Sequence, residues 1–79
     1  MIAIRRSLAA IARDIRRAWP RPYFGAVPYL DAMLSLELIS DSYGADSAAD
    51  IVRYFLSNAA TFRGPEARAL KAELKGLLS

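Results

Sequence analysis

The sequence predicts an all-α fold, a compact bundle of about four short helices joined by a proline- and aromatic-rich elbow and short loops. Apolar residues recur every three or four positions along most of the chain, which is the spacing of a buried helix face. No stretch alternates apolar and polar residues for long enough to indicate a strand. Because the chain has 79 residues and a hydrophobic content of 54%, we expect one domain, residues 1–79, with one core.

The first predicted helix spans residues 3–18 and is strongly amphipathic. Its apolar stripe consists of Ile4, Leu8, Ile11, Ile15 and Ala18. At about 100° per residue, five arginines fall on the opposite half of the cylinder, namely Arg5, Arg6, Arg13, Arg16 and Arg17. This arrangement predicts one side in the core and one basic side in solvent.

An elbow of twelve residues, 19–30, follows this helix and contains four aromatic residues and three prolines. Pro20 and Pro22 break a helix because each fixes φ and removes a backbone donor, whereas Pro28 fits the first turn of the next helix. That helix is predicted from Pro28 to about Leu38. Its expected buried positions are Leu30, Met33, Leu34 and Leu38. Residues 40–44 then form a loop, with Gly44 suited to a left-handed turn.

The third helix begins at Asp46 or Ser47, because Ser47 followed by Asp50 resembles a capping box. Its predicted buried face is Ala48, Ile51, Val52, Phe55, Leu56 and Ala59, with Tyr54 and Phe62 in the same packed cluster. After a break at 58–64, Pro65 and Glu66 open a fourth helix. We expect Ala67, Leu70, Leu74, Leu77 and Leu78 on its inner side, and Arg68, Lys71 and Lys75 on its outer side.

The residue inventory argues against catalysis. The chain has no cysteine and no histidine, which removes thiolate nucleophiles, histidine general bases and the usual zinc ligands. The nearest acidic cluster, Asp41, Asp46 and Asp50, matches no calcium-loop spacing. The glycines stand singly, so no phosphate-binding glycine loop is present. We therefore expect a protein that is not an enzyme and has no cofactor and no metal.

Charge is segregated along the chain, whose net charge is +3. Residues 1–21 carry six arginines and one aspartate, residues 22–50 carry five acidic and no basic residues, and residues 51–79 carry five basic and two acidic residues. This layout indicates a basic and an acidic face that steer a charged partner or pair copies head to tail. Separately, a small domain with a short core often gains stability by self-association, so a homodimer is expected. Alternatively, the patches lie side by side and partly cancel.

The candidate partner-binding residues are Arg5, Arg6, Arg13, Arg16, Arg17, Arg21, Trp19 and Tyr23. Arginine binds phosphate or carboxylate in a planar, bidentate manner, so this face suits a nucleic-acid backbone or an acidic protein groove. The alternative is a face that only solvates the helix. The elbow aromatics Trp19, Tyr23, Phe24 and Tyr29 either form an exposed anchor or plug the end of the bundle.

The basic amphipathic start also fits a transit peptide or a membrane-surface anchor. We favour a core helix, because the remaining chain is too short to bury its apolar faces without it. No apolar run approaches the ~18 residues needed to cross a bilayer, so no membrane partner is expected.

Several short motifs together suggest a family. They are Trp19, residues 23–33, 43–47, 54–59 and 62–64, and the pattern from Ala67 to Lys75. Over about residues 10–78 this string resembles small phage-encoded proteins and is similar to type I-C anti-CRISPR proteins of phage origin. The resemblance implies an inhibitor that acts in the host bacterial cytoplasm by stoichiometric binding to the CRISPR effector complex, without a cofactor. The alternative function is non-specific nucleic-acid binding by a small basic helical protein.

Overall fold

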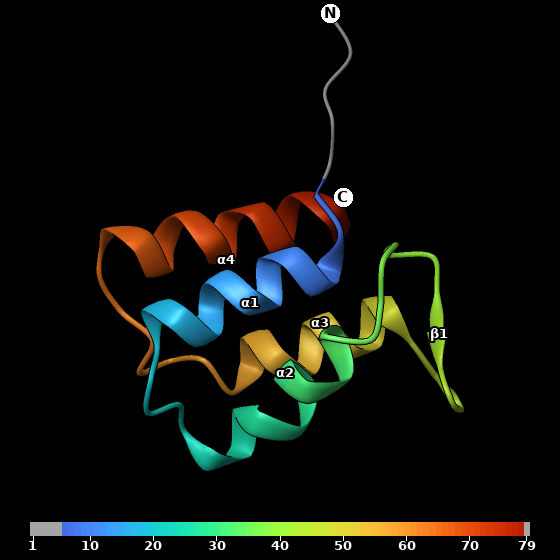
Figure 1. Ribbon diagram of the computed structural model, residues 1–79, viewed down its shortest axis with the longest axis horizontal. Helices are drawn as coiled ribbons and strands as arrows, with labels where there is room; N and C mark the ends of the chain where they lie inside the picture. The colour runs from blue at the N-terminus through green and yellow to red at the C-terminus, as the bar shows by residue number, and fades with distance from the viewer. Residues whose placement is uncertain (1–5, 79) are drawn as a thin grey trace, which may run out of the picture.

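The computed structural model describes residues 6–78, and within them four α-helices surround one core. The helices are α1 (Leu8–Ala18), α2 (Val27–Met33), α3 (Ala48–Ser57) and α4 (Pro65–Leu78). A 3-10 helix, η1 (Phe24–Ala26), precedes α2, and a hairpin of strands β1 (Ser42–Tyr43) and β2 (Asp46–Ser47) precedes α3 (Figure 1). The mostly helical fold is confirmed. The prediction of a purely all-α protein is wrong, because the chain also contains this small antiparallel sheet.

Helix α1 begins after Ser7, whose hydroxyl accepts a hydrogen bond from the amide of Ala10 at 3.1 Å. Serine is a favoured N-cap because it satisfies an amide that has no partner inside the helix. The helix therefore begins later than the predicted start at residue 3, since Arg6 and Ser7 are not helical. Residues 3–5 of the predicted helix lie outside the described residues. Within the described part, the predicted stripe is confirmed at three buried positions and one partly buried position, namely Leu8, Ile11, Ile15 and Ala18.

The elbow breaks the helix as predicted, and Pro28 lies in the first turn of α2. Helix α2, however, ends at Met33 and not near Leu38. Leu34 and Leu38 are 38% and 61% exposed, so their predicted burial is wrong. The chain turns after Met33, and Leu36, 3% exposed, enters the core in their place.

Two backbone hydrogen bonds connect this turn to the start of α1. The Leu8 amide donates to the carbonyl of Glu37, and the Ala9 amide donates to the carbonyl of Leu36, both at 2.9 Å. The first amides of a helix have no intrahelical acceptor, so these bonds satisfy donors that would otherwise need water. The carboxylate of Asp41 accepts from the amides of Glu37 and Leu38 and holds the turn.

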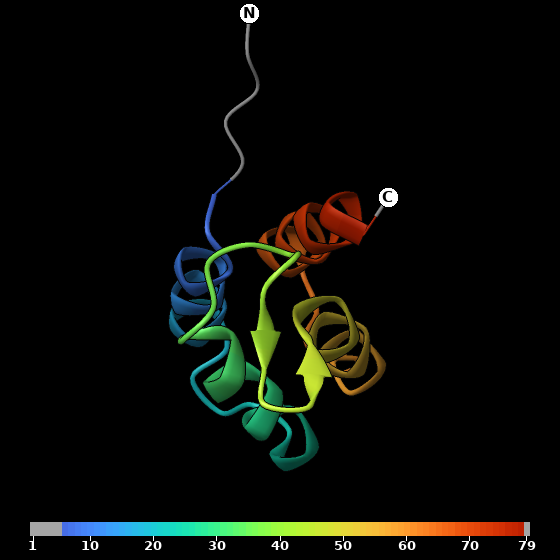
Figure 2. The ribbon, with the colours of Figure 1, turned by 90° about the vertical axis from the view of Figure 1, so that its right-hand side faces the viewer.

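The hairpin pairs Ser42 with Ser47 and Tyr43 with Asp46 (Figure 2). Gly44, in the turn between the strands, has a φ of +60°, which confirms its predicted left-handed conformation. Each strand has only two residues, too few to show the alternation that identifies a strand in a sequence. Ser47 then caps α3, because its hydroxyl accepts from the Asp50 amide at 3.1 Å.

Helix α3 carries the centre of the core, as predicted. Its buried residues are Ala48, Ile51, Val52 and Phe55, followed by Ala59 after the helix, whereas Leu56 is partly buried. Tyr54 is 44% exposed, so its predicted place in the packed cluster is wrong, although its ring lies 5.5 Å from that of Tyr29 between centroids.

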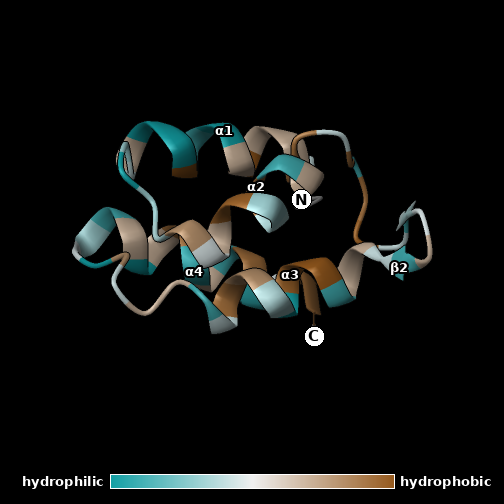
Figure 3. Cartoon of the chain, turned by 90° about the horizontal axis from the view of Figure 1, so that it is seen from below, coloured by the Kyte–Doolittle hydropathy of each residue, from teal (hydrophilic) through white to brown (hydrophobic). Residues whose placement is uncertain are grey.

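Helix α4 starts at Pro65, after Gly64 with a φ of +108°, and runs antiparallel along α1 (Figure 1). Ala67, Leu70 and Leu74 are buried and Leu77 and Leu78 are partly buried, which confirms the predicted inner side. Because α1 and α4 are antiparallel, the end of α1 and the start of α4 lie at the same end of the molecule. Seen from below the view of Figure 1, the outer side of α1 near this end is strongly hydrophilic (Figure 3).

Candidate binding surface

The predicted arginine face is divided by the structure. Arg13, Arg16 and Arg17 lie on α1 and are exposed, and Arg21 is exposed in the elbow. Arg6 precedes the helix, and Arg5 lies outside the described residues. The face is thus shorter than the sequence predicts, and its members differ in their electrostatic partners.

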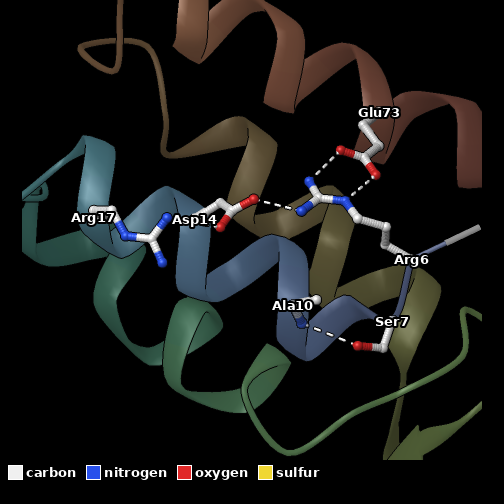
Figure 4. A network of polar contacts seen from close by, with 6 residues as sticks. All are labelled: Arg6, Ser7, Ala10, Asp14, Arg17 and Glu73. Carbon is white, nitrogen blue, oxygen red and sulfur yellow. Dashed lines mark hydrogen bonds and ion pairs between the residues drawn. The ribbon is translucent and has the colours of Figure 1, made fainter.

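Arg6 is held by two carboxylates from different helices (Figure 4). Its Nε donates to Glu73 Oε2 at 2.9 Å and its Nη2 donates to Glu73 Oε1 at 2.6 Å, a bidentate pair with α4. Its Nη1 donates to Asp14 Oδ2 on α1. These hydrogen bonds raise the pKa of Arg6 and lower the pKa of Asp14 below its ordinary value of 3.8. Arg6 therefore joins three segments of the chain.

Asp14 also pairs with Arg17, since Arg17 Nη1 lies 3.3 Å from Asp14 Oδ1. The Arg17 side chain remains 77% exposed, so this contact is weak in water. On α3, Arg53 pairs with Asp50 at 3.0 Å. Within residues 6–78, Arg13, Arg16 and Arg21 form no ion pair, and these three exposed guanidinium groups define what we call the free arginine face.

Trp19 is not an exposed anchor, although it was predicted as a partner-binding residue. Only 9% of it is exposed, and its ring stacks on Phe62 at 4.9 Å and meets Phe55 edge to face at 6.4 Å between centroids. An edge-to-face contact and a parallel stack are the favourable arrangements for aromatic rings. Trp19 therefore plugs the end of the bundle, which is the alternative that the sequence left open.

Tyr23 and its neighbour Phe24 are exposed, by 46% and 80%, and their ring centroids lie 4.8 Å apart. Tyr23 also lines a small, mainly apolar hollow of about 180 Å³, together with Ser57, Asn58, Ala60 and Thr61. A Cβ on Gly25 would come within 2.6 Å of the Tyr23 ring, so glycine permits this close packing. Tyr23 and Phe24 are thus the part of the elbow that a partner can reach.

A second basic region, which the sequence did not single out, surrounds a hollow of about 290 Å³ at the start of α4. Its lining consists of Phe62, Arg63, Gly64, Arg68 and Lys71. Lys71 was predicted on the outer side, but it is only partly exposed, and its Nζ lies 5.7 Å from the Phe62 ring centroid. The only sign of this region in the sequence is the spacing of the basic residues 63, 68 and 71. The geometry of the loop before α4 is what brings them to one hollow.

The acidic residues do not gather into a cluster: between residues 6 and 78, no group of three or more potential metal ligands comes together. Asp41 is used in a turn, and Asp50 in an ion pair. In that same range, no helix combines the length and apolarity that crossing a bilayer requires.

None of the protein-family models, curated proteins or solved structures compared with this chain matches it. The argument for function therefore depends on the surface of the molecule and on the motifs of its sequence.

Proposed function

We propose that this protein is a phage- or prophage-encoded inhibitor that binds a host type I CRISPR effector complex stoichiometrically in the bacterial cytoplasm. The observation that supports binding is the free arginine face, where Arg13, Arg16 and Arg21 are exposed without an ion pair in residues 6–78. The choice of partner comes from the resemblance to anti-CRISPR proteins. No catalytic step is part of the proposal.

The free arginine face suits a partner that carries phosphates or carboxylates. Each guanidinium group offers a planar fork of donors, and two of the three stand on α1, whose backbone is fixed by its packing on the core. The arginines would occupy a surface that the effector uses for nucleic-acid phosphates, or would pair with acidic residues of a subunit. Tyr23 and Phe24 add an apolar contact in the neighbouring elbow, since aromatic residues and arginine dominate binding hot spots.

The second candidate is non-specific nucleic-acid binding, which the same exposed arginines and the net charge of +3 favour. In that case the logarithm of the affinity should fall linearly with the logarithm of the salt concentration, because bound phosphates release counterions. An inhibitor of a protein complex should keep its partner after nuclease treatment.

The decisive experiment is co-purification of the tagged protein from a bacterium that expresses a type I CRISPR system, with and without nuclease. We expect stoichiometric recovery of effector subunits that survives nuclease treatment, and loss of this recovery in the R13Q/R16Q/R21Q variant. The control is R53Q, which removes an exposed cation that already has an ion-pair partner on α3. Recovery of only nuclease-sensitive nucleic acid would support the second candidate, and retained effector binding by the triple variant would refute the role of the free arginine face.

Self-association stays a prediction of the sequence, because small domains often gain stability from it. Sedimentation equilibrium at several protein concentrations would measure the monomer–homodimer balance.

A further inference from the structure

The hollow at the start of α4 is lined by basic residues that have no part in the proposed function. Three of its five lining residues are cations, Arg63, Arg68 and Lys71, and none is acidic. Within residues 6–78 none of the three forms an ion pair, in contrast to Arg6, Arg17 and Arg53. Three like charges around one concave surface repel one another, so the hollow favours an anion.

The environment of Lys71 supports this interpretation. Burial lowers the pKa of its ammonium group, and the positive charges of Lys75 and Arg63 lower it further. The group is nevertheless held in place, because its Nζ lies over the face of Phe62. An anion in the hollow would offset both the repulsion and the lost hydration of this ammonium group.

The backbone at this place adds to the positive potential. Pro65 has no amide hydrogen, and the amides of Glu66 and Ala67 in the first turn of α4 donate no hydrogen bond to the described residues. A helix of 14 residues also has its positive dipole end here. Glu66, in the same turn, is exposed and does not line the hollow.

We propose that the hollow lined by Phe62, Arg63, Gly64, Arg68 and Lys71 binds a phosphate group. Phosphate fits better than a nucleic-acid base, because Phe62 is only 3% exposed, with Trp19 stacked on it and Lys71 over its ring. The hollow therefore offers no aromatic face on which a base could stack, so the proposed recognition of phosphate does not depend on base sequence. The phosphate comes either from a free phosphate ester or from the backbone of a nucleic acid.

The test is a titration of the ¹⁵N-labelled protein with inorganic phosphate, followed by NMR, at constant ionic strength set with chloride. We expect saturable shifts of the Gly64, Glu66 and Ala67 amides. Binding should weaken at least about tenfold in R68Q/K71Q, since hydrogen bonds to charged groups are lost. The control R53Q removes a cation from α3 that lines neither the hollow nor the free arginine face, and it should retain wild-type phosphate affinity. Equal loss of affinity in R53Q and R68Q/K71Q, or linear shifts without saturation, would overturn the site.

Two further variants separate binding from folding. Lys71→Arg keeps the cation beside Phe62 and should retain most of the affinity, whereas R63Q leaves Lys71 and Arg68 in place and should weaken binding less than R68Q/K71Q. Unchanged binding in both R63Q and R68Q/K71Q, with dispersed amide spectra, would exclude the hollow as the site.

The source of the phosphate is distinguished by a short single-stranded oligothymidylate and thymidine monophosphate as probes. If the oligonucleotide shifts the same amides at lower concentration than the monophosphate, and R68Q/K71Q abolishes this, the site takes a nucleic-acid backbone. If the two saturate alike, it takes a free phosphate ester. Shifts at these amides with polyglutamate but not with phosphate would overturn the proposal, because the hollow would then select carboxylates.

Discussion

Replacing Phe55 with alanine should remove a large part of the stability of the domain. Phe55 is fully buried in α3, and its ring meets Trp19 edge to face. Truncation removes a phenyl group and leaves a cavity, which costs about 3–5 kcal/mol at such positions. A domain of this length has a total free energy of unfolding of roughly 4–12 kcal/mol. The variant should therefore unfold at a Tm at least about 12 °C lower, or be unfolded at the outset.

Urea unfolding followed by far-UV circular dichroism measures this loss, and the fluorescence of Trp19, the single tryptophan, provides a second probe. Phe24→Ala is the matched control, because the same ring is deleted at a site that is 80% exposed. Its free energy of unfolding should change by no more than about 0.5 kcal/mol. Equal losses in the two variants, or a wild-type midpoint for Phe55→Ala, would refute the assignment of the core.

Two further predictions concern polar contacts. Arg6 holds the pKa of Asp14 below its ordinary value of 3.8, so this carboxylate contributes stability that is fully present above about pH 4 and is lost as the pH falls through its lower folded-state pKa. Asp14→Asn should flatten the fall of Tm below about pH 4, and an acid profile identical to wild type would argue against the network. Ser47→Ala should cost about 0.5–2 kcal/mol in urea unfolding, because the Asp50 amide loses its acceptor. Ser40→Ala, at an exposed position, serves as its control, and equal costs would contradict the capping role.

Most of the helical fold could be predicted because local signals and tertiary packing agree. Ser47 and Pro65 mark helix starts in the sequence, and both mark them in the structure. The second half of the predicted helix after Pro28 failed for a different reason. Leu34 and Leu38 have helical spacing, but the turn that displaces them depends on the Asp41 side chain and on hydrogen bonds to α1. The spacing of apolar residues carries no information about the Asp41 hydrogen bonds or the hydrogen bonds to α1.

The basic character of the candidate surface could be predicted from the sequence, but the particular residues that form it could not. Helical spacing correctly placed Arg13 and Arg16 on the outer side of α1. It could not show that Arg6 would pair with Glu73, which is 67 positions away in the chain. The basic hollow was missed for the same reason, since the positions of Arg63 and Lys71 relative to Phe62 are set by the loop before α4.

The hydrogen bonds from Leu8 and Ala9 to the turn after α2 also bear on how the domain folds. A helix of 11 residues is marginal by itself, and here its first turn takes acceptors from a segment about 28 positions later. This turn of α1 is completed only when the first half of the chain has closed on itself. In hydrogen exchange, the amides of Leu8 and Ala9 would consequently report on that long-range closure, although they stand at a helix end where fraying is the usual behaviour.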